Sequence, residues 1–335
     1  MAAWAFSVPC LQGVRNKPLG LLMAWWGVRT LFLWTAVVRS GQGYPVGMLP
    51  GVLHALLLVL AYFSLCQLLT PLSYALIGKW LAVSTLGLLG YGLLQLVSLD
   101  QFFTQLSPAF EGDLLVGTIG NPTHFAAQLA LLSPWLWLQS GWFWKGVSVL
   151  AFLLLLLCGS TAGMLAYAAA FLVWGWHRFS SRRVLFSGVV LAGLGLFGVL
   201  SFQALNPHGR WEAWGQFYSY FQHRPITGLG LGYVMELSKI FVPGHPLYGW
   251  RHVHNEYFQL AIEGGVIALA LVSWLIYQTG QRFARAVKTP TVVACAASLV
   301  ALLVNSLLNF PLHLAGIGAY GLFAYVGLCL ATPEV

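Results

Sequence analysis

Polar and ionisable residues gather at the entry to a long apolar stretch near residue 256. The segment RHVHNEYFQLAIEGG covers residues 251–265, and a helix would place five of its polar residues along one stripe. These are His252, Asn255, Glu256, Gln259 and Glu263. The first N–H groups of a helix carry partial positive charge, and Arg251 adds a full charge beside His254. The pattern favours a phosphate-binding site around His254, and the alternative is that His254 is an ordinary loop residue.

A second segment, NPHGRWEAWGQFYSYFQHRP, covers residues 206–225. Aromatic residues recur at helical spacing between Arg210 and Phe221, and Pro225 sets the end of the predicted helix. Such an aromatic helix lies at headgroup level when it borders a membrane. Arg210 could bind a lipid phosphate through its guanidinium fork. Alternatively, it could stack on Trp214 and extend toward water.

Glycine and cysteine patterns give weaker signals. The run GLGLG at 228–232 matches part of a glycine-rich phosphate fingerprint, but no strand precedes it and no βαβ unit surrounds it. We therefore expect a flexible turn that leaves the aromatic helix. The five cysteines are scattered without a CxxC pair, and the long loop has no Asp-rich metal motif. We expect neither a metal nor another cofactor.

The composition excludes a soluble globular protein. Of the 335 residues, 59% are hydrophobic and only 7% are charged, whereas about a quarter are charged in a soluble domain. The chain is too apolar to be disordered, and its apolar runs are continuous rather than alternating. The sequence therefore predicts an all-α, polytopic integral membrane protein formed by residues 1–335 as one membrane-embedded domain.

We expect about ten transmembrane helices. The predicted spans are 19–38, 51–70, 80–98, 122–139, 146–160, 161–177, 184–204, 256–278, 291–308 and 311–330. With a cytoplasmic N-terminus, ten basic residues would face the cytoplasm and five the opposite side, where nearly all acidic residues would also lie. The loop 205–255 would then be periplasmic, and it holds five of the nine histidines. Because loops this long tend to be functional, we expect the site there.

Four segments together resemble a known family. HVHNEYFQLAIEGGVIAL resembles the HxHNxxLQxxxExG helix of O-antigen ligases, and RWEAWGQFYSYFQHRPITGLGLG resembles the RxxxW…HPxxGxGxG segment that precedes it. GTIGNPTHFAAQLALLSP, 117–134, resembles the family's GNPNHxAxxL helix entry, and CGSTAGMLAYAAAF, 158–171, resembles its GSRxGxL helix. The segments appear in family order over roughly the C-terminal two thirds of the chain.

The resemblance implies a glycan transferase of the bacterial inner membrane that takes part in lipopolysaccharide or polysaccharide biosynthesis. Family members move a glycan from a polyprenyl-pyrophosphate carrier to an acceptor on the periplasmic face, and no nucleic acid takes part. His254 and Arg210 match the family's functional residues. Arg210 would stabilise the leaving pyrophosphate, and His254 would remove a proton from the acceptor. We expect four further residues to bind substrate: Arg251, Asn255, Arg224 and Glu263.

The sequence departs from the family pattern after Ser160, where Thr161 follows instead of an arginine. Arg251 or Arg224 could supply the missing cation. The acceptor stays open among a lipid A core, a growing glycan and a protein, as in ligases, polymerases and protein O-oligosaccharyltransferases. A transporter or lipid flippase is the main alternative class, and a membrane scaffold is a third. A transporter would place its polar residues at mid-bilayer within repeated, broken helices, whereas here they gather in one loop.

Overall fold

The computed structural model describes residues 49–69, 71–97, 115–184, 209–238 and 241–331, with scattered positions among 21–28, at 99 and among 186–193. The predicted spans 19–38 and 184–204 lie largely outside these residues. Every regular element of the described residues is a helix, which confirms the predicted all-α class.

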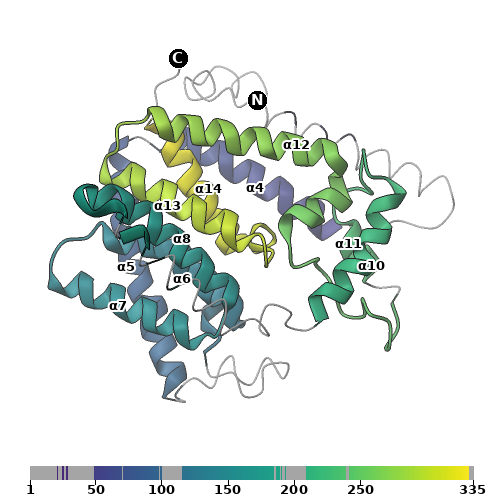
Figure 1. Ribbon diagram of the computed structural model, residues 1–335, viewed down its shortest axis with the longest axis horizontal. Helices are drawn as coiled ribbons and strands as arrows, with labels where there is room; N and C mark the ends of the chain where they lie inside the picture. Colours follow the sequence, from purple (N-terminus) through teal and green to yellow (C-terminus); the bar gives the residue numbers. More distant parts are fainter. Residues whose placement is uncertain are drawn as a thin grey trace.

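The described helices form a bundle (Figure 1). Its helices are α4 (Leu49–Leu68), α5 (Pro71–Leu96), α6 (Pro122–Trp137), α7 (Trp142–Leu157), α8 (Thr161–Arg178), α10 (Arg210–His223), α11 (Tyr233–Leu237), α12 (Glu256–Arg285), α13 (Pro290–Asn305) and α14 (Ala315–Leu330). Short 3₁₀ turns lie at Gly117–Ile119, Ser180–Arg182 and Pro311–His313. All eight other predicted spans fall on these helices.

Local sequence signals explain where the helices begin. Pro122 and Pro290 occupy the first positions of α6 and α13, where a missing N–H costs little. The side chain of Asn121 caps α6 by accepting from the N–H of Thr123 at 2.9 Å. Pro311 starts a 3₁₀ turn instead of a helix, so the chain between α13 and α14 is longer than predicted.

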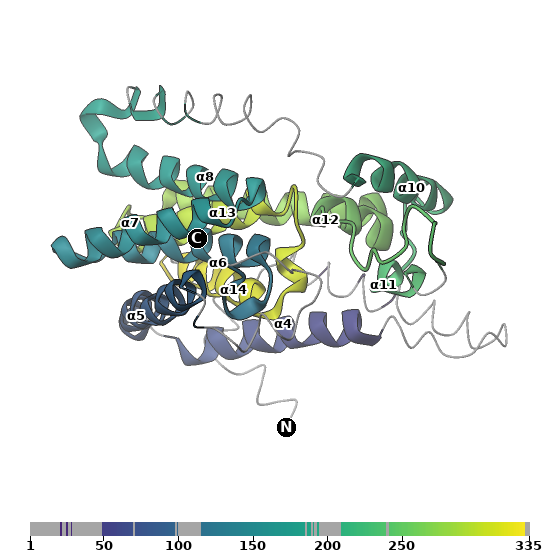
Figure 2. The same cartoon turned by 90° about the horizontal axis from the view of Figure 1, so that it is seen from below.

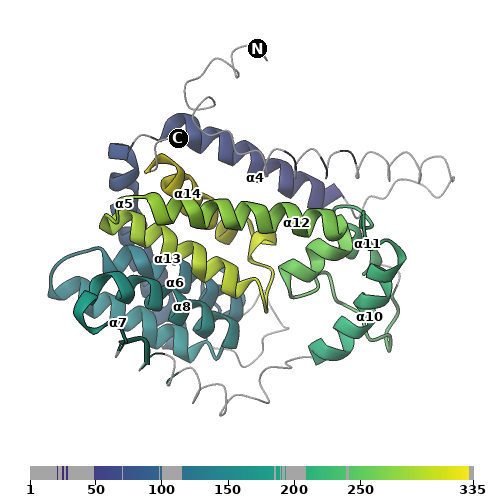
Figure 3. The same ribbon diagram turned by 45° about the horizontal axis from the view of Figure 1, so that its top comes forward.

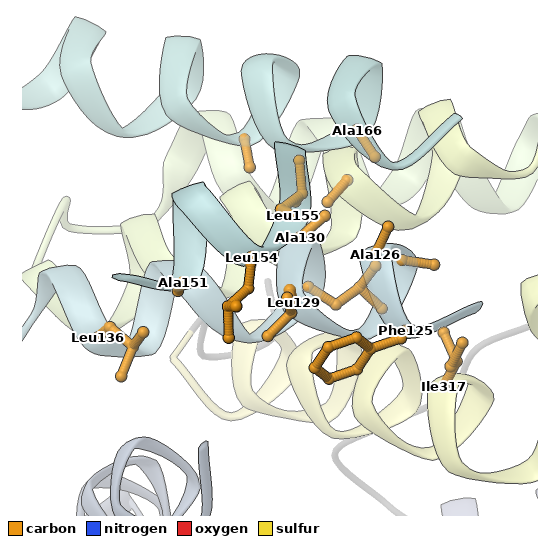
Figure 4. Packing of buried hydrophobic residues seen from close by; sticks show 14 of the residues in the cluster. Phe125, Ala126, Leu129, Ala130, Leu136, Ala151, Leu154, Leu155, Ala166 and Ile317 are labelled. Carbon is orange, nitrogen blue, oxygen red and sulfur yellow. The ribbon is translucent and has the colours of Figure 1, made fainter. Parts of the chain in front are cut away.

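Helix α6 forms the centre of the bundle and is buried from His124 to Leu136. It packs against α7, α8 and α13, and α13 packs in turn against α8 and α14. Figure 4 shows the leucines of α6 and α7 beside small residues of α6 and α8. A Cβ added to Gly163 would lie 2.5 Å from the Cβ of Ala126. Small residues thus let α6 and α8 approach closely, as membrane helices often do.

Three helical stretches are long and apolar enough to cross a membrane: Leu49–Cys66, Leu76–Leu96 and Glu256–Arg285. Three shorter apolar helices are Trp142–Leu157, Pro290–Asn305 and Ala315–Leu330. These helices agree with the predicted membrane protein. Helices α10 and α11 lie at one end of the bundle beside the start of α12, which runs from there toward the opposite end (Figures 1 and 2).

Candidate active site

Helix α10 carries Arg210 at its first position and confirms the predicted helix in this segment. Arg210, Ala213 and Phe217 form the buried face, since residues three and four apart share one side of a helix. The Arg210 side chain is buried, and this burial lowers its pKa because the charged form loses water. Within the described part of the chain, no hydrogen bond, ion pair or ring contact joins the guanidinium to another residue. Arg210 therefore places a buried cation at the start of α10.

His254 has a strained backbone. Its φ is 55°, and it is the one non-glycine residue with positive φ among those the structure describes. Such a conformation costs free energy and clusters at functional sites. The imidazole contacts the edge or face of two aromatic rings, with centroids 5.0 Å from Trp250 and 4.7 Å from Phe310.

Arg210 and His254 are brought to the same end of the molecule by contacts between α10 and the chain just before α12. The indole N–H of Trp214, one turn after Arg210, donates to the carbonyl of Val253 at 2.7 Å. Phe217 on the same face contacts Trp250, with ring centroids 6.5 Å apart. Figure 3 shows α10 and α11 beside the start of α12. The structure therefore places the two predicted functional residues on adjoining segments.

Phe310, which follows α13, is a hub that the sequence did not reveal. Its ring stacks on His252 at 4.3 Å and contacts the rings of His254 at 4.7 Å and His124 at 5.0 Å. Three imidazoles from two distant segments thus surround one phenyl ring. Burial, together with the nearby imidazoles of His313 and His254, lowers the pKa of His252 to about 3, so His252 is neutral at physiological pH.

A hydrogen-bonded pair, Glu256 and His313, lies beside these rings. The Nδ1 atom of His313 lies 2.9 Å from the Oε2 atom of Glu256, and the other carboxylate oxygen accepts from the N–H of Leu312 at 2.6 Å. Burial lowers the pKa of His313, but the charge and hydrogen bond of Glu256 outweigh it and raise the pKa to about 9. His313 falls within the predicted span 311–330, so nothing in the sequence indicated its pairing with Glu256. The spacing of Glu256 and His313 along the chain gives no signal for it.

The other predicted site residues occupy different environments. Arg224 and Arg251 are exposed, and Asn255 caps α12 by accepting from the N–H of Phe258 at 3.0 Å. Glu263 is buried and accepts from the N–H of Val234 at 3.4 Å and from Gln259 at 3.2 Å. In the described residues, no group of three or more His, Cys, Asp or Glu side chains is placed to hold a metal ion.

The glycine-rich run is buried and hydrogen-bonded to α12, whereas the sequence predicted a flexible turn that leaves the aromatic helix. Helix α12 is broken at Gly265, whose φ is 69° and ψ is −172°. The break leaves two carbonyls and two N–H groups without helical partners, and residues 225–230, which include the start of the run, supply partners for all four. The N–H groups of Leu229 and Gly230 donate to the carbonyls of Ile262 and Glu263, both at 2.8 Å. The N–H groups of Val266 and Ile267 donate to the carbonyls of Pro225 and Ile226 at 2.8 and 3.4 Å.

The sequence was compared with known proteins. Residues 146–273 match the family model for O-antigen ligase, Wzy_C. The matched stretch includes Arg210, His254 and the break at Gly265, and it ends before Phe310 and His313. A search of curated proteins found no match. The family match confirms the predicted resemblance to O-antigen ligases over residues 146–273.

Proposed function

We propose that the protein transfers a glycan from a polyprenyl-pyrophosphate carrier to an acceptor on the periplasmic face of the bacterial inner membrane. One observation carries this proposal: the helix that begins with a buried arginine contacts the segment that holds a strained histidine. Arg210 offers a cation to an anionic group, and His254 offers an imidazole to a proton. The family match supports the same chemistry.

In the proposed reaction, a hydroxyl oxygen of the acceptor attacks the anomeric carbon of the donor glycan. The bond between that carbon and the pyrophosphate oxygen breaks, and polyprenyl pyrophosphate leaves with the bonding electrons. His254 takes the hydroxyl proton as general base. The glycan is then linked to the acceptor oxygen, the proton is on His254, and the released pyrophosphate carries the bonding electrons.

Arg210 stabilises the negative charge that develops on the leaving pyrophosphate. A buried cation acts on that charge more strongly than an exposed one, because less water screens the interaction. Arg210 is also held in place before the reaction, since α10 packs through Phe217 and Trp214. Arg224 and Arg251 are exposed and would contact outlying parts of the donor.

The opposite end of the bundle supports the proposed orientation. Exposed Trp142 lies 4.2 Å from the ammonium group of Lys145, and exposed Trp176 lies 5.4 Å from the guanidinium of Arg183. Aromatic residues beside basic ones are typical of a cytoplasmic membrane interface. With this end in the cytoplasm, α10 and His254 would face the periplasm.

The decisive experiment measures release of polyprenyl pyrophosphate by the purified protein in detergent, since every acceptor yields this product. A polyprenyl-pyrophosphate oligosaccharide is the donor, and rough lipopolysaccharide, free oligosaccharide and a serine-containing peptide are the acceptors. We expect product with one acceptor class, which would distinguish a ligase from a polymerase or a protein oligosaccharyltransferase. Absence of product with all three acceptors, while the same protein moves the donor across sealed vesicles, would instead establish a flippase.

A further inference from the structure

The backbone on both sides of His254 is fixed by hydrogen bonds. The carbonyl of Val253 accepts from Trp214 at 2.7 Å, and its N–H donates to the Oε1 atom of Gln259 at 3.1 Å. On the other side, the N–H of Glu256 donates to the carbonyl of Ser306 at 2.9 Å. A strained conformation persists only where its surroundings hold it, and these bonds provide that hold.

Gln259 links the backbone of Val253 to the pair of Glu256 and His313. Because its Oε1 atom accepts from Val253, its Nε2 atom must serve as a donor. That atom lies 3.2 Å from Glu263 Oε1 and 3.1 Å from the Nε2 atom of His313. A continuous chain of contacts therefore runs from Glu256 through His313 and Gln259 to Val253, the residue before His254.

We propose that His313 is a positioning residue that holds His254 in its reactive orientation through Gln259 and Val253. This inference rests on the proposed transfer reaction. His313 comes from the turn between α13 and α14, so it braces the start of α12 from a separate element. Its Nδ1 atom is anchored by Glu256, and its Nε2 atom meets Gln259.

Several titratable groups surround His313. Glu256 and Glu263 approach from α12, the ring of His252 lies 4.9 Å away, and the ring of His54 from α4 lies 6.3 Å away. The two carboxylates favour a second proton on the imidazole, whereas the contact with Gln259 requires a lone pair on Nε2. Gln259 can therefore donate to His313 only when the imidazole is neutral, so the positioning role is tested at a pH above about 9.

Two substitutions separate the bonds of His313. In His313→Asn, the amide nitrogen stands near the position of Nδ1 and keeps the bond to Glu256, but nothing reaches Gln259. In His313→Gln, the longer side chain reaches Gln259. His223→Asn is the matched control, because His223 is exposed at the end of α10 and bonds only to Ser219 among the described residues. Size-exclusion chromatography and thermal unfolding in detergent report whether each variant folds.

The test measures kcat and the KM for the polyprenyl-pyrophosphate oligosaccharide by pyrophosphate release. We expect His313→Asn to lower kcat about 100-fold with little change in KM, since small misplacements of a reacting group cost about this much. His313→Gln should recover most of kcat. Equal kcat in the wild type and a folded His313→Asn variant would refute the positioning role and leave the proposed function standing. An inactive wild type would refute the proposed function itself.

Discussion

Replacing Gly265 by alanine tests the break in α12 that receives the glycine-rich run. Gly265 has positive φ with ψ near 180°, a region that only glycine occupies readily. A Cβ built at this position would lie 2.1 Å from the carbonyl oxygen of Ile226. With alanine at position 265, the backbone at the break is therefore strained, and the segment that contains Ile226 must move.

The cost can be estimated for both responses of the chain. If the break persists, the backbone strain alone costs about 1–3 kcal/mol. If α12 straightens, two helical hydrogen bonds form, but the four hydrogen bonds between α12 and residues 225–230 are lost. The buried N–H groups of Leu229 and Gly230 are then unsatisfied, at about 1–3 kcal/mol each. Either response lowers the free energy of unfolding by at least about 1 kcal/mol.

Gly280→Ala is the matched control, because it makes the same change in the same helix where nothing lies within 4 Å of the added Cβ. Alanine should stabilise that helical position by about 0.5–1 kcal/mol. Thermal unfolding of both variants in one detergent gives the comparison. A Gly265→Ala variant as stable as the Gly280→Ala variant would refute the reasoning, because it would show that the break needs no glycine.

Four further predictions concern the site. Arg210→Ala should lower kcat about 10²–10³-fold in the pyrophosphate-release assay, whereas Arg183→Ala at the opposite end should not; equal effects would remove Arg210 from the site. His254→Ala should lower kcat about 10²–10⁴-fold while the protein still inserts, and full turnover would exclude it as the base. Because Glu256 raises the pKa of His313 to about 9 from 6.5, its stabilisation is complete below pH 6.5 and is lost as the pH rises through 9. The wild type should therefore lose up to about 3 kcal/mol over that range relative to Glu256→Gln, and parallel pH curves of unfolding would contradict this. EDTA should leave the rate of pyrophosphate release unchanged. A lower rate that is restored by adding a metal ion would contradict the expected metal independence.

The sequence was sufficient to predict most of the described helices and to single out Arg210 and His254 as candidate site residues. Prolines and capping residues marked the helix starts, and Arg210 and His254 lie in or beside one long loop that folds onto the start of α12. Their convergence could be predicted because it needs only contacts between neighbours along the chain.

The rest of the site could not be predicted, because it depends on contacts between distant segments. Phe310 and His313 lie in an apolar sequence that resembles the end of one membrane helix and the start of the next. Only the packing of α14 against α12, together with the hydrogen bond from Glu256 to Ser306, brings this turn to the start of α12. Likewise, the glycine-rich run could not be recognised as a partner for a broken helix, since hydropathy does not show that α12 is broken.

The turn between α13 and α14 has a consequence for transplanting specificity between relatives. The matched stretch ends at residue 273, while the ring that touches three imidazoles and the carbonyl that receives the N–H of Glu256 belong to residues 306–310. A chimera that exchanges only the matched stretch would place the segment around His254 from one protein against residues 306–310 from another. Exchanges that carry residues 306–313 along with the loop should keep both surfaces complementary.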